Sequence, residues 1–207
     1  MVEKHGFIAY LAKVHYAMSI VASFTHPTAN AIEFTRAAFR AATETGDLTY
    51  ACYSVERSIT GPLLQSDPLD MVWRESERGL DFVRKAGFRD IADMIVSQQR
   101  FIATMHGRTA TFSTFSDTHF DEAMFETQLT GKRVTSMICW YWILKLKARY
   151  LSGDYGEALA AADNAKRLLW ATALYFQKLD PTTTRRWLSR RSTRTRRSWS
   201  SKSGGGS

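Results

Sequence analysis

Glycine recurs along this chain at a nearly constant interval, and that interval restricts the folds open to it. Gly6, Gly46, Gly87 and Gly131 are separated by 40, 41 and 44 residues, and each follows a stretch of helical composition. Glycine adopts the left-handed conformation that closes an α-helix without steric cost. The spacing therefore predicts four units that each end at a glycine.

A second turn signal lies about midway between these glycines. Thr25-His26-Pro27 and Ser66-Asp67-Pro68 each offer a side-chain oxygen that can cap a helix, followed by a proline at a helix start. Gly153-Asp154 stands at the corresponding place in the last unit, whereas the third unit carries a longer insert at residues 108–118, rich in Thr, Ser and Phe. We therefore expect each unit to be a pair of helices of roughly twenty residues joined by a turn.

Apolar residues within these helices recur at helical spacing. Three faces show the pattern: Ile32, Ala38 and Phe39; Val72, Leu80 and Val83; and Ile91, Met94, Ile95 and Ile102. A hairpin of about 40 residues cannot bury its apolar face alone, so neighbouring hairpins must pack together. We expect an all-α fold over residues 1–179, a right-handed stack of antiparallel helical hairpins, about four in number. A compact helical bundle is the alternative.

The last unit combines aromatic, small and turn-forming residues in one pattern: Trp142, Ala148, Tyr150, Gly153, Tyr155, Ala158 and Ala165. These residues fall at or near the signature positions of the tetratricopeptide repeat, which the last unit resembles. Small alanines stand where the paired helices of that repeat approach closely. The resemblance implies a tetratricopeptide-like α-solenoid.

Positive charge is concentrated at the end of the chain. Of 28 Lys and Arg residues, eight lie in residues 181–207, which contain no acid, so residues 1–180 hold 20 basic and 20 acidic residues. A neutral body argues against nucleic acid or an anionic membrane as its partner. Residues 180–207 lack apolar periodicity and are predicted to be a disordered Arg- and Ser-rich tail, derived from a frameshift or a linker.

The tail offers non-specific, salt-sensitive binding of nucleic acid, because its basic residues are interleaved with Trp187 and Trp199. Its candidate contacts are Arg185, Arg186, Arg190, Arg191, Arg194, Arg196 and Arg197.

The remaining composition is typical of a cytoplasmic protein. Cys52 and Cys139 lie far apart in apolar helical stretches, and we expect buried, reduced thiols. The N-terminal residues carry an acid and a histidine before any apolar run, unlike an export signal. The longest apolar stretch, residues 137–146, is interrupted by Lys145 and is too short to span a membrane. We expect no membrane partner.

Catalytic motifs are missing from the sequence. It has no GxxxxGK[ST] phosphate loop, HExxH, CxxC, GxSxG or kinase catalytic loop. His119, with Asp117, Asp121 and Glu122, offers ligands for a hard metal or groups for acid–base chemistry. Acids in the first turn of a helix over residues 119–129 explain this cluster better. We expect a chain that is not an enzyme and that has no metal and no cofactor.

The run Cys139-Trp140-Tyr141-Trp142 places three aromatic rings on one predicted helix. Successive helical residues point in different directions, so the rings cannot form one platform. We expect core packing for these rings. The alternative is that Trp140 and Trp142 line an interaction groove on a concave face of the stack.

Several strings in the chain resemble one protein family. They are AFRAATETGDLTYACYS (38–54), VWRESERGLDFVRKAGFRD (72–90), SQQRF (97–101), FSTFSD (112–117) and CWYWILKLKARYLSGDY (139–155). They are similar to the helical region of large bacterial multidomain kinases, in which a serine/threonine kinase-like domain precedes a P-loop ATPase module of the AAA type, this helical region, a GAF sensor domain and a histidine kinase.

That resemblance covers residues 1–179 and includes no catalytic motif, so no active-site residue can be transferred. It implies that the parent phosphorylates proteins and binds or hydrolyses ATP. Residues 1–6 match the last turn of a second helix, so we expect an earlier part of that helix in the parent.

Two classes of function follow. The first is a non-catalytic scaffold or protein-interaction segment that couples the ATPase and sensor-kinase modules of a signal-transduction protein. The second is a stand-alone helical-repeat adaptor with non-specific nucleic-acid binding through the tail. Kinase and ATPase sequence directly upstream distinguishes the first from the second.

Overall fold

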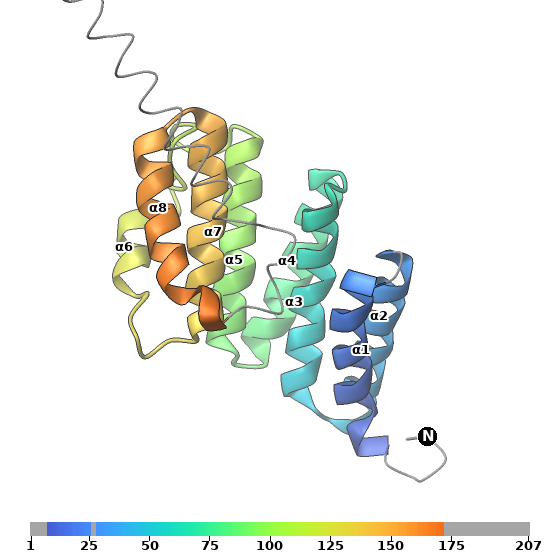
Figure 1. The fold of residues 1–207 in the computed structure, drawn as a ribbon. Coiled ribbons are helices and arrows are strands. Elements are labelled where there is room, and N and C mark those ends of the chain that lie inside the picture. The colour runs from blue at the N-terminus through green and yellow to red at the C-terminus, as the bar shows by residue number, and fades with distance from the viewer. Residues whose placement is uncertain (1–7, 26–27, 172–207) are drawn as a thin grey trace, which may run out of the picture. The chain divides into compact units, whose positions relative to one another are not determined.

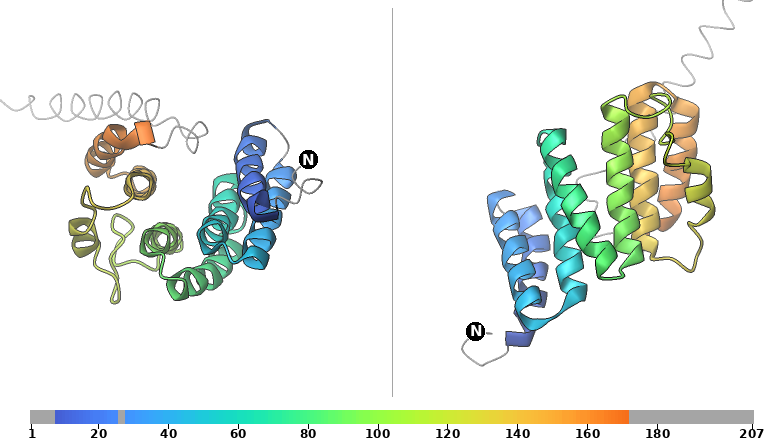
Figure 2. Two further views of the ribbon diagram at one scale, coloured as in Figure 1. Left: turned by 90° about the horizontal axis from the view of Figure 1, so that it is seen from below. Right: turned by 180° about the vertical axis from the view of Figure 1, so that it is seen from behind.

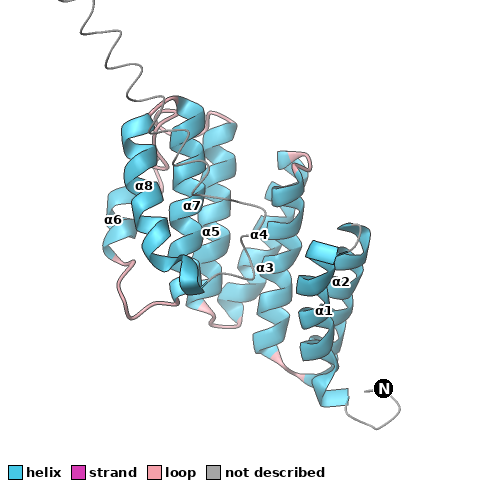
Figure 3. Cartoon of the chain, in the orientation of Figure 1, coloured by secondary structure: helices cyan, strands magenta, loops and turns pink. Residues whose placement is uncertain are grey.

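The computed structural model describes residues 8–25 and 28–171. Within these ranges the chain is helical and has no strand, which confirms the all-α prediction (Figure 1, Figure 3). Its α-helices are α1 (Leu11–Thr25), α2 (Thr28–Thr45), α3 (Leu48–Gln65), α4 (Leu69–Lys85), α5 (Arg89–Met105), α6 (Glu122–Thr127), α7 (Thr135–Ser152) and α8 (Tyr155–Leu168). Two short 3₁₀ helices, η2 (Ile8–Tyr10) and η3 (Leu169–Ala171), precede α1 and follow α8.

The chain divides into two compact units, residues 1–102 and 103–207, with the boundary inside α5. In the first unit, α1 contacts α2 and α3, α2 contacts α3, and α3 contacts α4. In the second unit, α7 contacts α8. Within each unit the chain reverses direction at the short turns, so consecutive long helices form hairpins (Figure 2).

One turn geometry closes five of these helices. At Gly46, whose φ is 73°, the amide of Asp47 donates to the Ala42 carbonyl at 2.8 Å, and the Gly46 amide donates to the Thr43 carbonyl at 3.4 Å. This pair of hydrogen bonds is the Schellman motif. The same pair closes α3 at Ser66, α4 at Gly87, α5 at Gly107 and α7 at Gly153, each with positive φ.

These turns confirm part of the predicted glycine spacing and revise the rest. Gly46 and Gly87 end helices as predicted. Gly131 does not, because α6 already ends at Thr127 and Gly131 has no positive φ. Schellman turns follow one another at positions 46, 66, 87 and 107, and the next turn of this kind comes only at 153. Gly6 lies outside the described residues.

The predicted cap at Ser66-Asp67-Pro68 is wrong. Ser66 has a φ of 63° and closes α3, while α4 begins after Pro68 without a side-chain cap. The left-handed backbone places Ser66 at a helix end, so its hydroxyl does not serve a helix start. His26 and Pro27, of the other predicted triplet, lie outside the described residues.

The predicted turn at Gly153-Asp154 is confirmed. Gly153 closes α7, and the Asp154 carboxylate accepts a hydrogen bond from the Glu157 amide at 3.3 Å, which caps α8. Asp47 does the same for α3, accepting from the Tyr50 amide at 3.2 Å. Each carboxylate also lies where the helix dipole favours negative charge.

The predicted apolar faces form much of the core of the first unit. Val72, Leu80 and Val83 of α4 are buried, as are Ile91, Met94, Ile95 and Ile102 of α5. Ala38 of α2 is buried, with Ile32 and Phe39 half-buried. Helical spacing therefore identified the inward side of these three helices.

Close approach between α3 and α4 depends on Gly79. A Cβ atom there would lie 2.8 Å from Cγ1 of Val55 and 2.9 Å from Cδ1 of Ile59. Real Cβ atoms do not come this close to other atoms. A glycine inside a helix costs stability, and here it allows the two helices to pack.

A polar cluster is buried inside the first unit. The Thr60 hydroxyl donates to Oε1 of Glu56, and Nε2 of Gln98 lies 3.1 Å from the same oxygen and 2.5 Å from the Thr60 hydroxyl. All three side chains are buried. Burial raises the pKa of Glu56 above its ordinary value of 4.5, although Thr60, Arg57 and Gln98 act in the opposite direction.

In the second unit, small residues let α7 and α8 approach closely. Leu146 of α7 packs with Ala158, Ala161 and Ala162 of α8. Ala148 and Ala165 are buried, and half-buried Trp142, Tyr150 and Tyr155 complete the contact. The alanines predicted to lie at a close helix contact do so.

Both cysteines are buried free thiols, as predicted. No helix of the described part is long and apolar enough to cross a membrane. The predicted tail, with its seven candidate arginines, lies outside the described residues.

Candidate interaction site between α5 and α7

The regular spacing of helix stops breaks between Gly107 and Gly153, and this interruption is the candidate functional site. Residues 106–121 contain no helix, α6 has only six residues, and residues 128–134 lead into α7 (Figure 3). We name residues 106–134 the inserted segment. Insertions into helical repeats form loops on one face, often the face that binds a partner.

Hydrogen bonds within the inserted segment give it a defined shape. The Ala110 amide donates to the Ser116 carbonyl at 2.8 Å. The Asp117 carboxylate accepts from the amides of His119 and Phe120, at 2.7 Å and 2.9 Å. Such an Asx turn substitutes for backbone pairing where the chain is not helical.

The helix predicted over residues 119–129 is shorter than expected. Asp121 is extended and its carboxylate accepts from the Met124 amide at 2.9 Å, so α6 begins at Glu122. The helix ends at Thr127. The predicted acidic first turn is therefore present, with Asp121 as its cap and Glu122 as its first residue.

Glu122 ties the inserted segment to α7. The Arg149 guanidinium donates to both oxygens of this buried carboxylate, at 2.6 Å to Oε2. From the segment itself, the Phe115 amide and the Thr114 hydroxyl donate to Oε2 at 2.8 Å and 2.9 Å. The Lys145 ammonium lies 3.3 Å from Oε1. Both carboxylate oxygens therefore have donors, as a buried charge requires.

Tyr141, Lys145 and Arg149 share one face of α7, because they lie four residues apart. The Tyr141 hydroxyl donates to Oε1 of Glu126 at 2.5 Å, and the Lys145 ammonium donates to the same oxygen at 2.6 Å. Lys145 also lies 3.8 Å from Glu157 in the first turn of α8. This face of α7 thus connects α6 with α8.

Aromatic packing closes the contact between the segment and α7. Phe115 is fully buried, and its ring centroid lies 5.9 Å from that of Tyr141. The ring of Phe125 lies 5.2 Å from Tyr141, and the Arg149 guanidinium lies 5.1 Å above the Phe115 ring. Burial of a Phe side chain stabilises a fold by about 1.5 to 3 kcal/mol, so the two rings hold the segment firmly.

The electrostatics of this cluster keep its charges fixed. Burial alone raises the pKa of Glu122, but the Phe115 amide, Lys145, Arg149 and the Thr114 hydroxyl together lower it below 4.5. The cluster therefore forms a permanent ion pair at neutral pH.

Tyr141 stays protonated, because burial and the nearby carboxylates disfavour its ionised form. Burial, the charge of Glu122 and the hydrogen bond to Glu126 raise the pKa of Tyr141 far above its ordinary value of 10.0. Its hydroxyl therefore remains a donor to Glu126 throughout the physiological range.

On this anchored base the segment presents the exposed apolar side chains Phe112 and Met124, and Val134 is also exposed at its end, just before α7. The residue after Phe112 is fastened: the Ser113 hydroxyl donates to Oδ2 of Asp154 at 2.7 Å. Met124 lies in α6, between the anchoring residues Glu122 and Phe125. Exposed apolar residues on a preorganised surface are suited to protein binding, since little entropy is lost when they are covered.

The two tryptophans predicted as a groove differ in their surroundings. Trp140 is only 2% exposed, so its side chain cannot line an open groove, and that part of the prediction is wrong. Trp142 is half-buried, with its ring 5.2 Å from Tyr141 and the Lys145 ammonium 5.4 Å above it. Trp142 therefore borders the charged cluster, and core packing holds for Trp140 and Tyr141.

The three acids near His119 each form a different contact. Asp117 forms the Asx turn, Asp121 caps α6, and Glu122 binds Arg149. Of the described residues, no three His, Cys, Asp or Glu side chains are grouped as a metal site requires.

Sequence reasoning missed the pairing of Glu122 with Arg149. The available signal was the charge pattern of α7, where Lys145 and Arg149 interrupt an apolar helix four residues apart. Cations on the inward side of a helix require buried acids nearby. Glu122 and Glu126, also four residues apart, are the matching pair.

Comparison of the chain with family models, curated proteins and solved structures found no match. The likeness to tetratricopeptide repeats and to the helical region of multidomain kinases therefore stays a prediction from the sequence.

Proposed function

We propose that this chain is a non-catalytic stack of helical hairpins of the tetratricopeptide kind. In this proposal it serves as a protein-interaction segment of a cytoplasmic bacterial signal-transduction protein. One observation carries the proposal: the same Schellman turn closes helices at Gly46, Ser66, Gly87 and Gly107, at intervals of 20 or 21 residues. Helices of nearly equal length that end in the same turn are typical of a repeat protein, and repeat proteins act mainly by binding.

The inserted segment is the proposed binding surface. It stands where the repeat is interrupted, and Glu122, Phe115 and Phe125 anchor it against α7. Phe112 and Met124 are the proposed contact residues. Side chains of the anchoring cluster pair with one another, which suits a role in holding the surface in shape.

The proposed partners are the neighbouring modules of the parent protein, an ATPase and a sensor kinase. This part of the proposal rests on the resemblance of the sequence at residues 38–54, 72–90 and 139–155 to the helical region of multidomain kinases. In such a chain the helical segment transmits a change in one module to the other by binding both.

The DNA on both sides of the coding region tests this assignment. We expect one reading frame that runs from kinase and ATPase sequence, through this segment, into GAF and histidine kinase sequence. An isolated gene with its own promoter contradicts it. A second arm uses the purified chain with ATP: hydrolysis or phosphotransfer above a buffer control contradicts the non-catalytic assignment.

A further inference from the structure

The exposed side of α1 differs chemically from that of α4. The described exposed positions of α4 are almost all charged: Asp70, Met71, Arg74, Glu75, Glu77, Arg78, Asp81, Arg84 and Lys85. Those of α1 are mostly apolar: Lys13, Val14, Ala17, Met18, Val21 and Thr25. A helix surface meant for water carries polar residues, so the outer side of α1 lacks the usual pattern.

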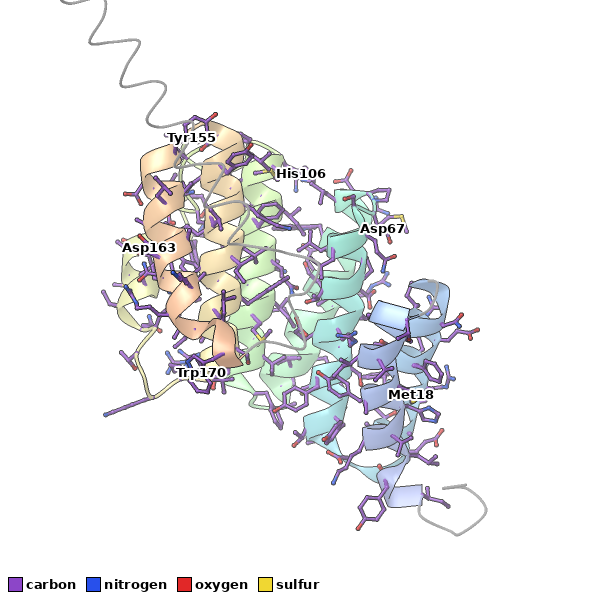
Figure 4. All side chains as sticks on the ribbon, viewed as in Figure 1. Met18, Asp67, His106, Tyr155, Asp163 and Trp170 are labelled. Carbon is purple, nitrogen blue, oxygen red and sulfur yellow. The ribbon has the colours of Figure 1, made fainter. Side chains whose placement is uncertain are left out.

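Four large side chains form a stripe along this side of α1 and the end of η2 that precedes it. Tyr10, Val14, Met18 and Val21 follow one another at steps of four, four and three residues, so they share one face. Their exposed fractions are 55%, 39%, 40% and 50%. Figure 4 labels Met18 on α1. We name these four residues the α1 stripe.

The opposite face of α1 is already used within the first unit. Ala12, Tyr16, Ser19 and Ala22 are buried, and α1 contacts α2 and α3. The Arg57 guanidinium of α3 donates to the Ser19 carbonyl at 2.9 Å, which fixes the orientation of α1. The α1 stripe is therefore the outward face of a helix held firmly by its inward face.

The chemistry of the stripe selects its partner. Of the exposed α1 positions described, only Lys13 is charged, and its ammonium lies over the rings of Tyr10 and Tyr50 at 5.6 Å and 5.7 Å. A charged partner surface, such as the outer face of α4, would lose hydration here and gain few ion pairs. The matching surface must be uncharged and apolar, and the α1 stripe of a second copy has this chemistry.

We propose that the α1 stripe is a self-association surface through which two copies of this chain pack α1 against α1. An antiparallel arrangement about a twofold axis makes the contact self-complementary. With the axis level with position 16, Val14 of one copy packs against Met18 of the second copy. The two Lys13 residues are then about 9 Å apart along the helix axis, which keeps their charges separate.

The dimer is weak because the contact is small. The 15 residues of α1 extend over about 22 Å. One helix face buries less than the roughly 1,200 Å² of a standard stable interface. We expect a dissociation constant of about 10 to 1,000 µM.

Sedimentation equilibrium of the full chain from 10 µM to 1 mM, at about 0.15 M and 1 M NaCl, tests the proposal. We expect reversible dimers that persist at high salt, since an apolar contact does not depend on ion pairs. Val14→Glu and Met18→Glu should each weaken association at least tenfold. Met71→Glu is the matched control, because Met71 is 64% exposed on the charged side of α4 and should leave association unchanged.

Two results overturn the proposal. One is a chain that stays monomeric up to 1 mM, or that dimerises only at low salt. The other is dimerisation that survives both glutamate substitutions, in proteins shown by circular dichroism to be folded. The orientation has its own test: a mixture of Val14→Cys and Met18→Cys chains should form disulfide-linked dimers faster than either variant alone, and faster linkage within a single variant contradicts the antiparallel arrangement.

Discussion

The Arg149 guanidinium donates hydrogen bonds to both carboxylate oxygens of Glu122, and both side chains are buried. Their positions are 27 residues apart in sequence, and the inserted segment and α7 meet at this pair. The ion pair holds together a part of the chain in which the regular succession of helices is interrupted.

Glu122→Ala should destabilise the protein by about 3 to 5 kcal/mol, because it leaves Arg149 buried without its carboxylate and removes the acceptor of the Phe115 amide. Arg149→Ala should cost a similar amount for the reciprocal reason. The double variant Glu122→Ala, Arg149→Ala should lose less stability than the sum of the two single losses, since it removes both charges together. Urea unfolding of the four proteins measures this, and strictly additive losses contradict a coupled pair.

Glu56 and Glu122 should give the protein opposite responses to pH. The pKa of Glu56 is raised by burial, so the folded state loses stability as pH rises from the ordinary value of 4.5 through the folded pKa of Glu56. Glu56→Gln keeps an oxygen for the donors at Thr60 and Gln98, so its stability relative to wild type should increase over this window. Thermal unfolding between pH 4 and pH 9 measures the difference, and a constant difference contradicts the raised pKa.

Glu122 supplies the contrast. Its pKa is lowered, so its contribution to stability is present above 4.5 and is lost as pH falls through the folded value. The loss of stability of Glu122→Gln relative to wild type should therefore be smallest at low pH and largest at neutral pH. The same scan, extended below pH 4, measures it, and a deficit that grows toward acid pH contradicts this assignment.

Two helical glycines should respond in opposite directions to alanine. Gly79→Ala should cost about 1 to 3 kcal/mol, because the added Cβ meets Val55 and Ile59. Gly156→Ala in α8 is the control: its nearest atom, Oδ1 of Asp154, lies 3.9 Å from the new Cβ. That substitution should stabilise by about 0.5 to 1 kcal/mol through helix propensity. Equal effects of the two substitutions in urea unfolding contradict the close packing of α3 on α4.

Neither cysteine should react with a thiol reagent in the folded protein. Burial raises the pKa of Cys52 to about 11, and the Cys139 thiol is buried 3.6 Å from the Ala165 carbonyl. Reagents attack the thiolate, which is scarce and inaccessible at Cys52. Ellman's reagent at pH 8 should therefore label no thiol quickly before denaturation and two thiols per chain in guanidinium. Rapid native labelling contradicts the described core.

Local features of this fold were predictable, and long-range features were not. Gly46 and Gly87 mark helix ends because a left-handed residue is a local requirement, and helical periodicity located the buried faces around Val83 and Ile95. Gly131 was misread because a glycine indicates a turn without showing that a helix precedes it. The residues before Gly131 belong to the inserted segment, and its short helix α6 already ends at Thr127.

The candidate site was only partly visible in the sequence. The insert at residues 108–118 was recognised by its composition, and the acidic start of α6 by Asp121 and Glu122. Their pairing with α7 depends on the path of the loop, which no local pattern encodes. Burial of Trp140 beside half-buried Trp142 likewise depends on which helices cover each side of α7.

We propose that this chain acts by binding a neighbouring module through the inserted segment. Isothermal titration of the purified flanking modules into the chain tests it most directly. We predict binding by at least one module, weakened tenfold or more, about 1.4 kcal/mol, by Phe112→Ser with Met124→Ser, and unchanged by the control Met71→Ser. No binding of either module, or equal affinity of the double variant and wild type, would contradict the account.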